Sequence, residues 1–251
     1  MKALLATILI ALPGLAWGQR VLEFSHDFAF SAREVNSLAA HAYGARLRTL
    51  ALAGKLDRDP ALKARLKRIV PRLLRAACYE RPAAAKLEWE VHSCSRCDEN
   101  ASAMAGGKLL VSADMVRRLR LSDDELAYLL AHEMAHVLAQ HTREFVSVAR
   151  YFVDNGLHRD YSDIENELSQ SFPVMLRMHP VYVQQELEAD RIGFVLGAQA
   201  GFRPGAMISL LKKLGDGGET VLATHPTEAQ RLAQARNMLE TARRLYAHAL
   251  K

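Results

Sequence analysis

The sequence of 251 residues has few cysteines, no internal repeat and no low-complexity segment. After residue 18 it also has no apolar run long enough to cross a membrane. Half of the residues are hydrophobic, which allows a sizeable core and excludes general disorder. The formal net charge of +5 is too small to indicate a highly charged partner by itself. These features predict one compact domain.

Residues 1–18 are typical of a secretory signal peptide. Lys2 gives a positive start, an apolar stretch follows, and Ala16 and Gly18 provide the small residues that a signal peptidase reads. We expect cleavage after Gly18, with residues 19–251 forming a domain in the periplasm. An uncleaved anchor is the alternative, but the apolar stretch is shorter than the roughly twenty residues that span a bilayer. We therefore expect no stable transmembrane anchor in the mature form.

The three cysteines all lie in the part that is expected to be exported. Cys94 and Cys97 have the spacing of a zinc knuckle, but no second pair completes four ligands. A redox motif is a further alternative. A structural disulfide, either local or linked to Cys78, fits an oxidising compartment better, and the connectivity is left open.

The spacing of apolar residues predicts a mainly α protein with a small β-sheet, in the α+β class. Short strands are expected at 87–92 and 108–112, with a turn at Gly106-Gly107 between the helical parts of the chain. Residues 145–180 contain two prolines and an irregular pattern, which suggests a partly helical flap over a cleft. Helices are expected at 31–53, 60–78, 122–141, 181–200, 204–214 and 226–249.

The helix at 60–78 carries six basic residues, so a polyanion-binding face is conceivable. A solvated amphipathic helix explains the pattern better, because five apolar residues at helical spacing supply a buried stripe. We expect no nucleic-acid partner. The apolar residues are Leu62, Leu66, Ile69, Leu73 and Leu74.

The strongest chemical signal is His132-Glu133-Met134-Ala135-His136, an HExxH pattern in the middle of a predicted helix. Residues four apart lie on one helical face, so both imidazoles can bind one Zn²⁺. Glu133 can then take a proton from the attacking water and deliver it to the leaving amine. The capping box of Ser122 and Glu125 marks the start of this helix.

A catalytic zinc requires a third protein ligand. His141 follows His136 by five residues without the glycine of the metzincin pattern, so we interpret it as a helix-end residue, with a place behind the metal ligands as the less favoured alternative. Glu186 and Asp190 are four residues apart on a second helix, where they suit a ligand and an acidic partner for a zinc-bound imidazole. Glu188 points about 200° away from Glu186 and is the weaker candidate.

These residues resemble the gluzincin metallopeptidase family of the CAAX prenyl endopeptidases and the heat-shock protease HtpX, and particularly its soluble periplasmic BepA-type members. The resemblance covers roughly half of the chain, and the HExxH and ExxxD pair in this order is its specific part. Unlike the BepA-type members, this sequence shows no tetratricopeptide repeat, which puts large outer-membrane assembly partners in doubt. The matching pieces are 100–101, 106–107, 132–136, 186–190, 201–204, 225–226 and Arg231.

The resemblance implies a zincin-like domain with an active-site helix, an edge strand at 106–112 that pairs with substrate, and one Zn²⁺ per chain. It implies zinc ligation by His132, His136 and Glu186. Glu133 would be the general base and Asp190 would support a zinc-bound imidazole. The resemblance further places two more residues near the metal: His225, which can occupy the open position, and Arg231, which faces the same cleft.

The expected function is zinc-dependent endoproteolysis of unfolded or misassembled polypeptides in the cell envelope, outer-membrane proteins among them. The alternative is a latent, chaperone-like protein that binds clients while its zinc site is blocked by His225. The ligand set and the export signal favour the first, while the flap at 145–180 motivates the second. The sequence leaves the physiological substrate, the cleavage preference and the oligomeric state open.

Overall fold

The computed structural model describes residues 28–97, 100–215 and 226–251. The predicted signal segment 1–18 lies outside these residues. Within the described ranges, no helix is long and apolar enough to cross a bilayer.

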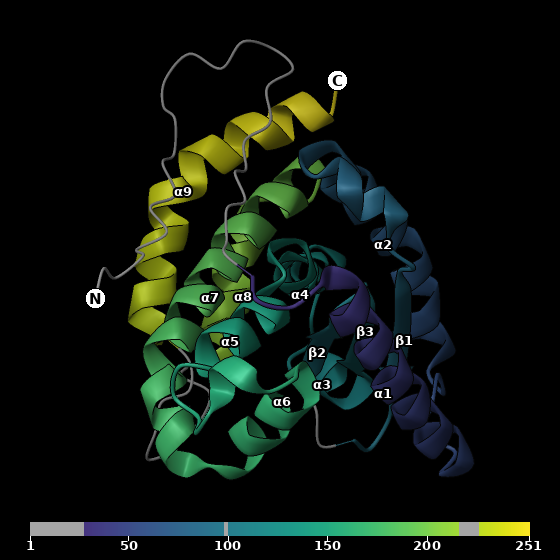
Figure 1. The fold of residues 1–251 in the computed structure, drawn as a ribbon. Helices are drawn as coiled ribbons and strands as arrows, with labels where there is room; N and C mark the ends of the chain where they lie inside the picture. The colour runs from purple at the N-terminus through teal and green to yellow at the C-terminus, as the bar shows by residue number, and fades with distance from the viewer. Residues whose placement is uncertain (1–27, 98–99, 216–225) are drawn as a thin grey trace.

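The predicted class, mainly α with a small β-sheet, is confirmed (Figure 1). The elements are α1 Ala32–Leu52, α2 Pro60–Glu80, η1 Pro82–Lys86, β1 Glu90–Cys94, β2 Ala101–Met104, β3 Lys108–Ser112, α3 Ala113–Arg118, α4 Asp123–Ala139, α5 His141–Ala149, η2 Gly156–His158, α6 Tyr161–Gln170, α7 Phe172–Gln199, α8 Gly205–Leu214 and α9 Glu228–Ala249.

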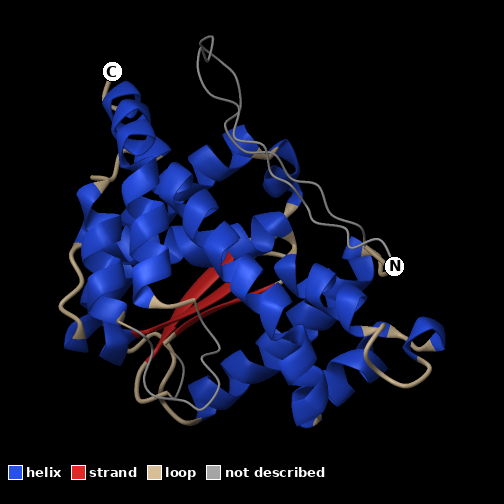
Figure 2. Ribbon diagram, turned by 90° about the vertical axis from the view of Figure 1, so that its left-hand side faces the viewer, coloured by secondary structure: helices blue, strands red, loops and turns tan. Residues whose placement is uncertain are grey.

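The described strands form one sheet in the order β1-β3-β2, surrounded by helices (Figure 2). β3 is parallel to β1 and antiparallel to β2. The prediction that 106–112 is an edge strand is therefore wrong, because β3 has a neighbour on each side. The edge strands are β1 and β2, and the Ala-Ser-Ala-Met sequence of β2 lacks the β-branched residues that mark strands. Gly106 and Gly107 have φ of 79° and 91° and make the turn between β2 and β3.

Helix α4 is the central helix of the molecule, and most of its residues are buried. It begins at the predicted capping box, in which the Ser122 hydroxyl accepts from the Glu125 backbone and the Glu125 carboxylate accepts from the Ser122 backbone. It ends before the predicted position, because Gln140 has the left-handed φ of 58°. His141 therefore begins α5 instead of ending α4.

The segment 145–180 is more helical than its sequence suggested. It contains α6, most of α5 and the first turns of α7. The two prolines do not interrupt α7: Pro173 lies in its first turn, where no backbone donor is needed, and Pro180 is accommodated inside the helix. A flap made of helices, rather than of irregular chain, thus stands beside the cleft.

Part of the basic face of α2 is occupied by internal contacts. Arg65 donates to Asp123 at the start of α4, at 2.6 Å. Arg72 donates to the backbone oxygens of Ala200 and Gly201, after the end of α7. The face that raised the question of polyanion binding therefore also ties α2 to the core.

One disulfide is present among the described residues, between Cys94 and Cys97. Cys78 is a half-buried free thiol on α2. Of the alternatives that the sequence left open, the structure thus contains the local disulfide at the end of β1.

Helix α7 crosses α4 at unusually short range, and two glycines permit this. A Cβ on Gly193 would lie 2.8 Å from the backbone nitrogen of His132, and a Cβ on Gly197 would lie 2.3 Å from the ring of Tyr128. Real Cβ atoms do not approach other atoms so closely. The glycines therefore set the separation of the helices that carry the HExxH residues and Glu186.

Replacing Gly193 by alanine is expected to destabilise the protein by about 2–3 kcal/mol, because the new methyl group meets backbone that cannot rotate away. Gly44→Ala is the matched control in α1, where the nearest atom would be 3.5 Å away. That control should be neutral or stabilising by up to about 1 kcal/mol, because alanine favours a helix. Urea unfolding measures both. Equal stabilities for the two variants would contradict the close contact between α7 and α4 at Gly193.

Candidate metal centre

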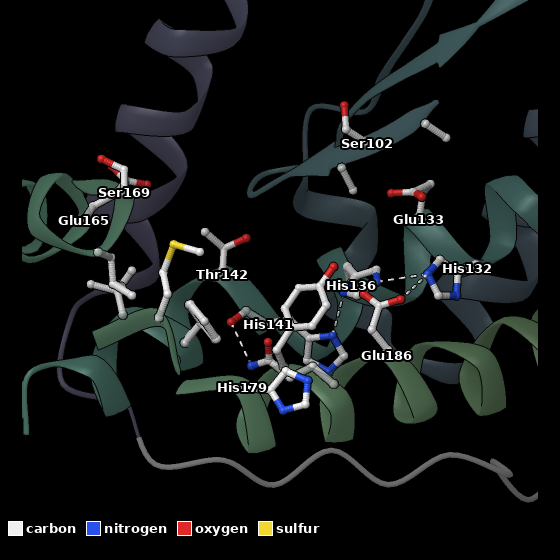
Figure 3. A pocket seen from close by; sticks show the side chains of 18 of the residues that line it. Ser102, His132, Glu133, His136, His141, Thr142, Glu165, Ser169, His179 and Glu186 are labelled. Carbon is white, nitrogen blue, oxygen red and sulfur yellow. Dashed lines mark hydrogen bonds and ion pairs between the residues drawn. The ribbon is translucent and has the colours of Figure 1, made fainter. Parts of the chain in front are cut away.

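Three side chains from two neighbouring helices converge on one point. His132 and His136 come from α4, and Glu186 comes from α7 (Figure 3). The Nε2 atoms of the two histidines are 3.1 Å apart. The Glu186 carboxylate lies 3.5 Å from Nε2 of His132 and 3.3 Å from Nε2 of His136. These three residues form a group that could hold a metal ion.

The separations are near those of a tetrahedral metal site, with a different oxygen of Glu186 facing each imidazole. Ligand atoms bound at about 2.0–2.1 Å to a tetrahedral ion lie about 3.3–3.4 Å from one another. Burial alone would lower the pKa of His132, but the carboxylates of Asp190 and Glu186 raise it to about 10. The same carboxylates favour a metal cation between the ring nitrogens. The residues present therefore fit a metal ion.

His132 is held from behind by a buried ion pair. Its Nδ1 lies 3.0 Å from Asp190, which accepts two hydrogen bonds from Arg231, at 2.6 and 2.7 Å. Burial would raise the pKa of Asp190, but the hydrogen bonds from Arg231 and His132 lower it. Arg231 is itself buried, so this contact fixes Asp190, and through it the tautomer and orientation of His132.

His136 has a different partner on its outer side. Its Nδ1 lies 2.9 Å from Nδ1 of His141, whose Nε2 lies 3.4 Å from Glu188 (Figure 3 labels the histidines). His141 is buried, and burial lowers its pKa. The interpretation of His141 as an ordinary helix-end residue is therefore wrong. The signal that could have found it is its spacing of five from His136 across a possible helix break.

Glu133 and a large cavity adjoin the ligand set. Glu133 is buried, and this burial raises its pKa, although the neighbouring imidazoles oppose the effect. The cavity has a volume of about 730 Å³ and extends from the ligands between β2 and the flap helices. Glu133 lies on the side of the ligands that faces Ser102 of β2 (Figure 3).

The structure thus brings together six of the seven site residues that the sequence singled out. The seventh, His225, lies outside the described residues. Sequence reasoning missed the contribution of Gly193, and its only signal was a pair of glycines four apart inside a helix. The six are His132, Glu133, His136, Glu186, Asp190 and Arg231.

Residues 60–239, more than half of the chain, match peptidase family M48. The chain is 31% identical over 167 residues to the mitochondrial metalloendopeptidase OMA1 of Arabidopsis thaliana, covering 64% of this chain and 34% of that protein. It is also 31% identical over 176 residues to the Saccharomyces cerevisiae protein of that name, covering 64% and 50%. The beta-barrel assembly-enhancing protease of Escherichia coli O157:H7 is 31% identical over 163 residues, covering 55% and 32%.

These matches confirm the predicted resemblance to a gluzincin family. The chain spans about a third to a half of the length of these relatives. The predicted periplasmic location is contradicted, because the matched relatives from a plant and two yeasts are mitochondrial. That prediction rested on the leader-like residues 1–18.

The contact between Arg231 and Asp190 predicts a large effect on stability. Arg231→Met would remove the guanidinium that pairs with the buried Asp190 carboxylate, which costs about 3–5 kcal/mol. Arg244→Met removes an exposed pair with Glu240, at 3.8 Å, and should cost less than about 0.5 kcal/mol.

Both variants are to be unfolded in urea in the presence of a chelator, so that metal binding does not contribute. If Arg231 acts only on substrate, as its predicted place in the cleft suggested, the two variants will be equally stable. That result would contradict the supporting role of the buried pair.

Proposed function

Because this chain belongs to peptidase family M48, we propose that it is a zinc-dependent endopeptidase that cleaves unfolded or misassembled polypeptides. The observation that carries the proposal is the convergence of two Nε2 atoms and the Glu186 carboxylate, within 3.1 to 3.5 Å of one another, beside Glu133. Two imidazoles and one carboxylate are a ligand set of catalytic zinc sites, which leave the fourth position for water or substrate.

Glu133 has the features of a general base. When bound, zinc would supply Lewis-acid chemistry and make a water molecule acidic enough to attack a peptide bond near neutral pH. The Glu133 carboxylate would take the proton of the attacking water and pass it to the nitrogen of the leaving amine. A raised pKa suits this exchange, because the group must both accept and release a proton.

The edge strand β2 supports an extended polypeptide as substrate. Ala101, Ser102 and Ala103 line the cavity beside Glu133 and the metal ligands. The open side of an edge strand presents backbone donors and acceptors, on which a further strand can add. A substrate paired in this way would lie extended across the ligand set, and only an unfolded or flexible segment can adopt that conformation.

The apolar wall of the cavity supports the same class of substrate. Phe145 and Val146 of α5, Leu168 of α6, and Met175 and Leu176 of α7 line it. Folded proteins bury most large apolar side chains, whereas unfolded chains expose them. Side chains of this kind would fill the cavity while the neighbouring peptide bond lies at the ligands.

Glu133→Gln is expected to lower cleavage of an unfolded protein such as reduced casein by roughly 10³-fold, because the amide cannot accept the proton. Zinc content measured by mass spectrometry should remain one ion per chain, since the ligands are unchanged. Removing zinc with a chelator should abolish wild-type cleavage. Wild-type activity in the glutamine variant, or in the zinc-free protein, would contradict the proposal.

Leu176→Asp is expected to lower kcat/KM for an unfolded polypeptide about tenfold, because a carboxylate in the apolar wall disfavours apolar side chains. Leu176 is 49% exposed, so the fold should tolerate the change. Leu157→Asp is the matched control, at 61% exposure and outside the cavity lining. If both variants cleave as wild type does, the cavity does not receive substrate side chains.

A further inference from the structure

We propose that His141 and Glu188 form a positioning pair for the metal ligand His136. In this arrangement His141 fixes the orientation of the His136 ring and the nitrogen that carries its hydrogen. The inference rests on the proposed zinc site, and it assigns a function to two residues outside the set of metal ligands. It starts from the contacts of His136 on the side away from the ligand set.

A metal bound to His136 would fix which ring nitrogens of His136 and His141 donate hydrogen bonds and which accept them. Nε2 of His136 faces the other ligands, so a metal bound there leaves the hydrogen of His136 on Nδ1. This Nδ1 lies 2.9 Å from Nδ1 of His141, which must then accept. His141 consequently carries its own hydrogen on Nε2, which lies 3.4 Å from the Glu188 carboxylate. Each of the four ring nitrogens of His136 and His141 therefore has one role: to bind the metal, to donate or to accept.

The backbone around His141 is arranged to make this contact. Gln140 takes the left-handed φ of 58°, a conformation that costs a non-glycine residue about 1–3 kcal/mol. The turn at Gln140 ends α4 and starts α5 at His141, which brings the His141 ring back against His136. Gln185 of α7 donates to the backbone oxygen of His141 at 3.1 Å and holds the turn against that helix.

Glu188 lies on α7, where its carboxylate is 3.5 Å from Arg191, an ion pair without a hydrogen bond. The side chains of His141 and Glu188 are 3% and 13% exposed, so water competes little for this contact. The two imidazole ligands are therefore supported differently. His132 is backed by the charged Asp190, whereas His136 is backed by a second imidazole that links it to a carboxylate.

The test compares two replacements of His141 by zinc affinity, measured in competition with a chromophoric chelator. His141→Leu removes the acceptor and should weaken zinc binding about 10–100-fold. His141→Asn places an oxygen near the position of the lost Nδ1, and it should keep the affinity within about threefold of wild type. A merely space-filling role predicts the opposite order, because leucine fills the buried site better. His158→Leu, at an exposed histidine, is the control and should bind as wild type does.

Glu188 provides a second, independent variant if His141→Leu does not fold. Glu188→Leu should weaken zinc binding several-fold, while Glu188→Gln, which keeps an acceptor, should restore it. In the His141→Leu background, Glu188→Leu should have no further effect, since its influence passes through His141. Additive effects, or wild-type affinity in all of these variants, would overturn the inference alone. A wild-type protein that binds no zinc would overturn the proposed function as well.

Discussion

The metal centre depends on the close contact between α4 and α7. Gly193 lets the α7 backbone pass beside the backbone of His132, at a distance that any side chain would increase. Because α7 lies so near α4, the residues from Glu186 to Asp190 on α7 contact both histidine ligands and the residues next to them. Glu186 contacts both imidazoles of the ligand set, Asp190 contacts His132 from its other side, and Glu188 contacts His141 beside His136. A small shift of α7 would therefore disturb all of these contacts together.

This arrangement concentrates charge in the core and compensates it locally. Asp190 is buried with Arg231, whose Nε lies 2.6 Å from its carboxylate. Glu186 faces both imidazoles and also interacts with the charge of Arg231. Uncompensated buried charge is expensive, so a cation at this point would contribute to the stability of the fold as well as to chemistry. Stability and site are thus coupled through the same few side chains.

The metal ligands could be predicted from the sequence, whereas several of the elements that surround and support them could not. The capping box and the HExxH spacing are local, so α4 and its two histidines followed from neighbouring residues. Glu186 was predicted from its helical spacing to Asp190 in a chain that already carries the HExxH motif, and the resemblance to a family supported it. β2 could not be recognised, because its pairing with β3 is not encoded in its own four residues. The roles of His141 and Gly193 depend on a left-handed residue and on a crossing of two helices, and neither is visible in periodicity.

The central claim is that His132, His136 and Glu186 bind one zinc ion through Nε2 and carboxylate atoms. Anomalous scattering at the zinc edge, from crystals of the wild-type protein grown with zinc, tests it most directly. The account predicts one strong peak about 2.0–2.2 Å from both Nε2 atoms and from the Glu186 carboxylate. A strongest peak elsewhere, for example at Cys78, or coordination through Nδ1 of either histidine, would contradict it.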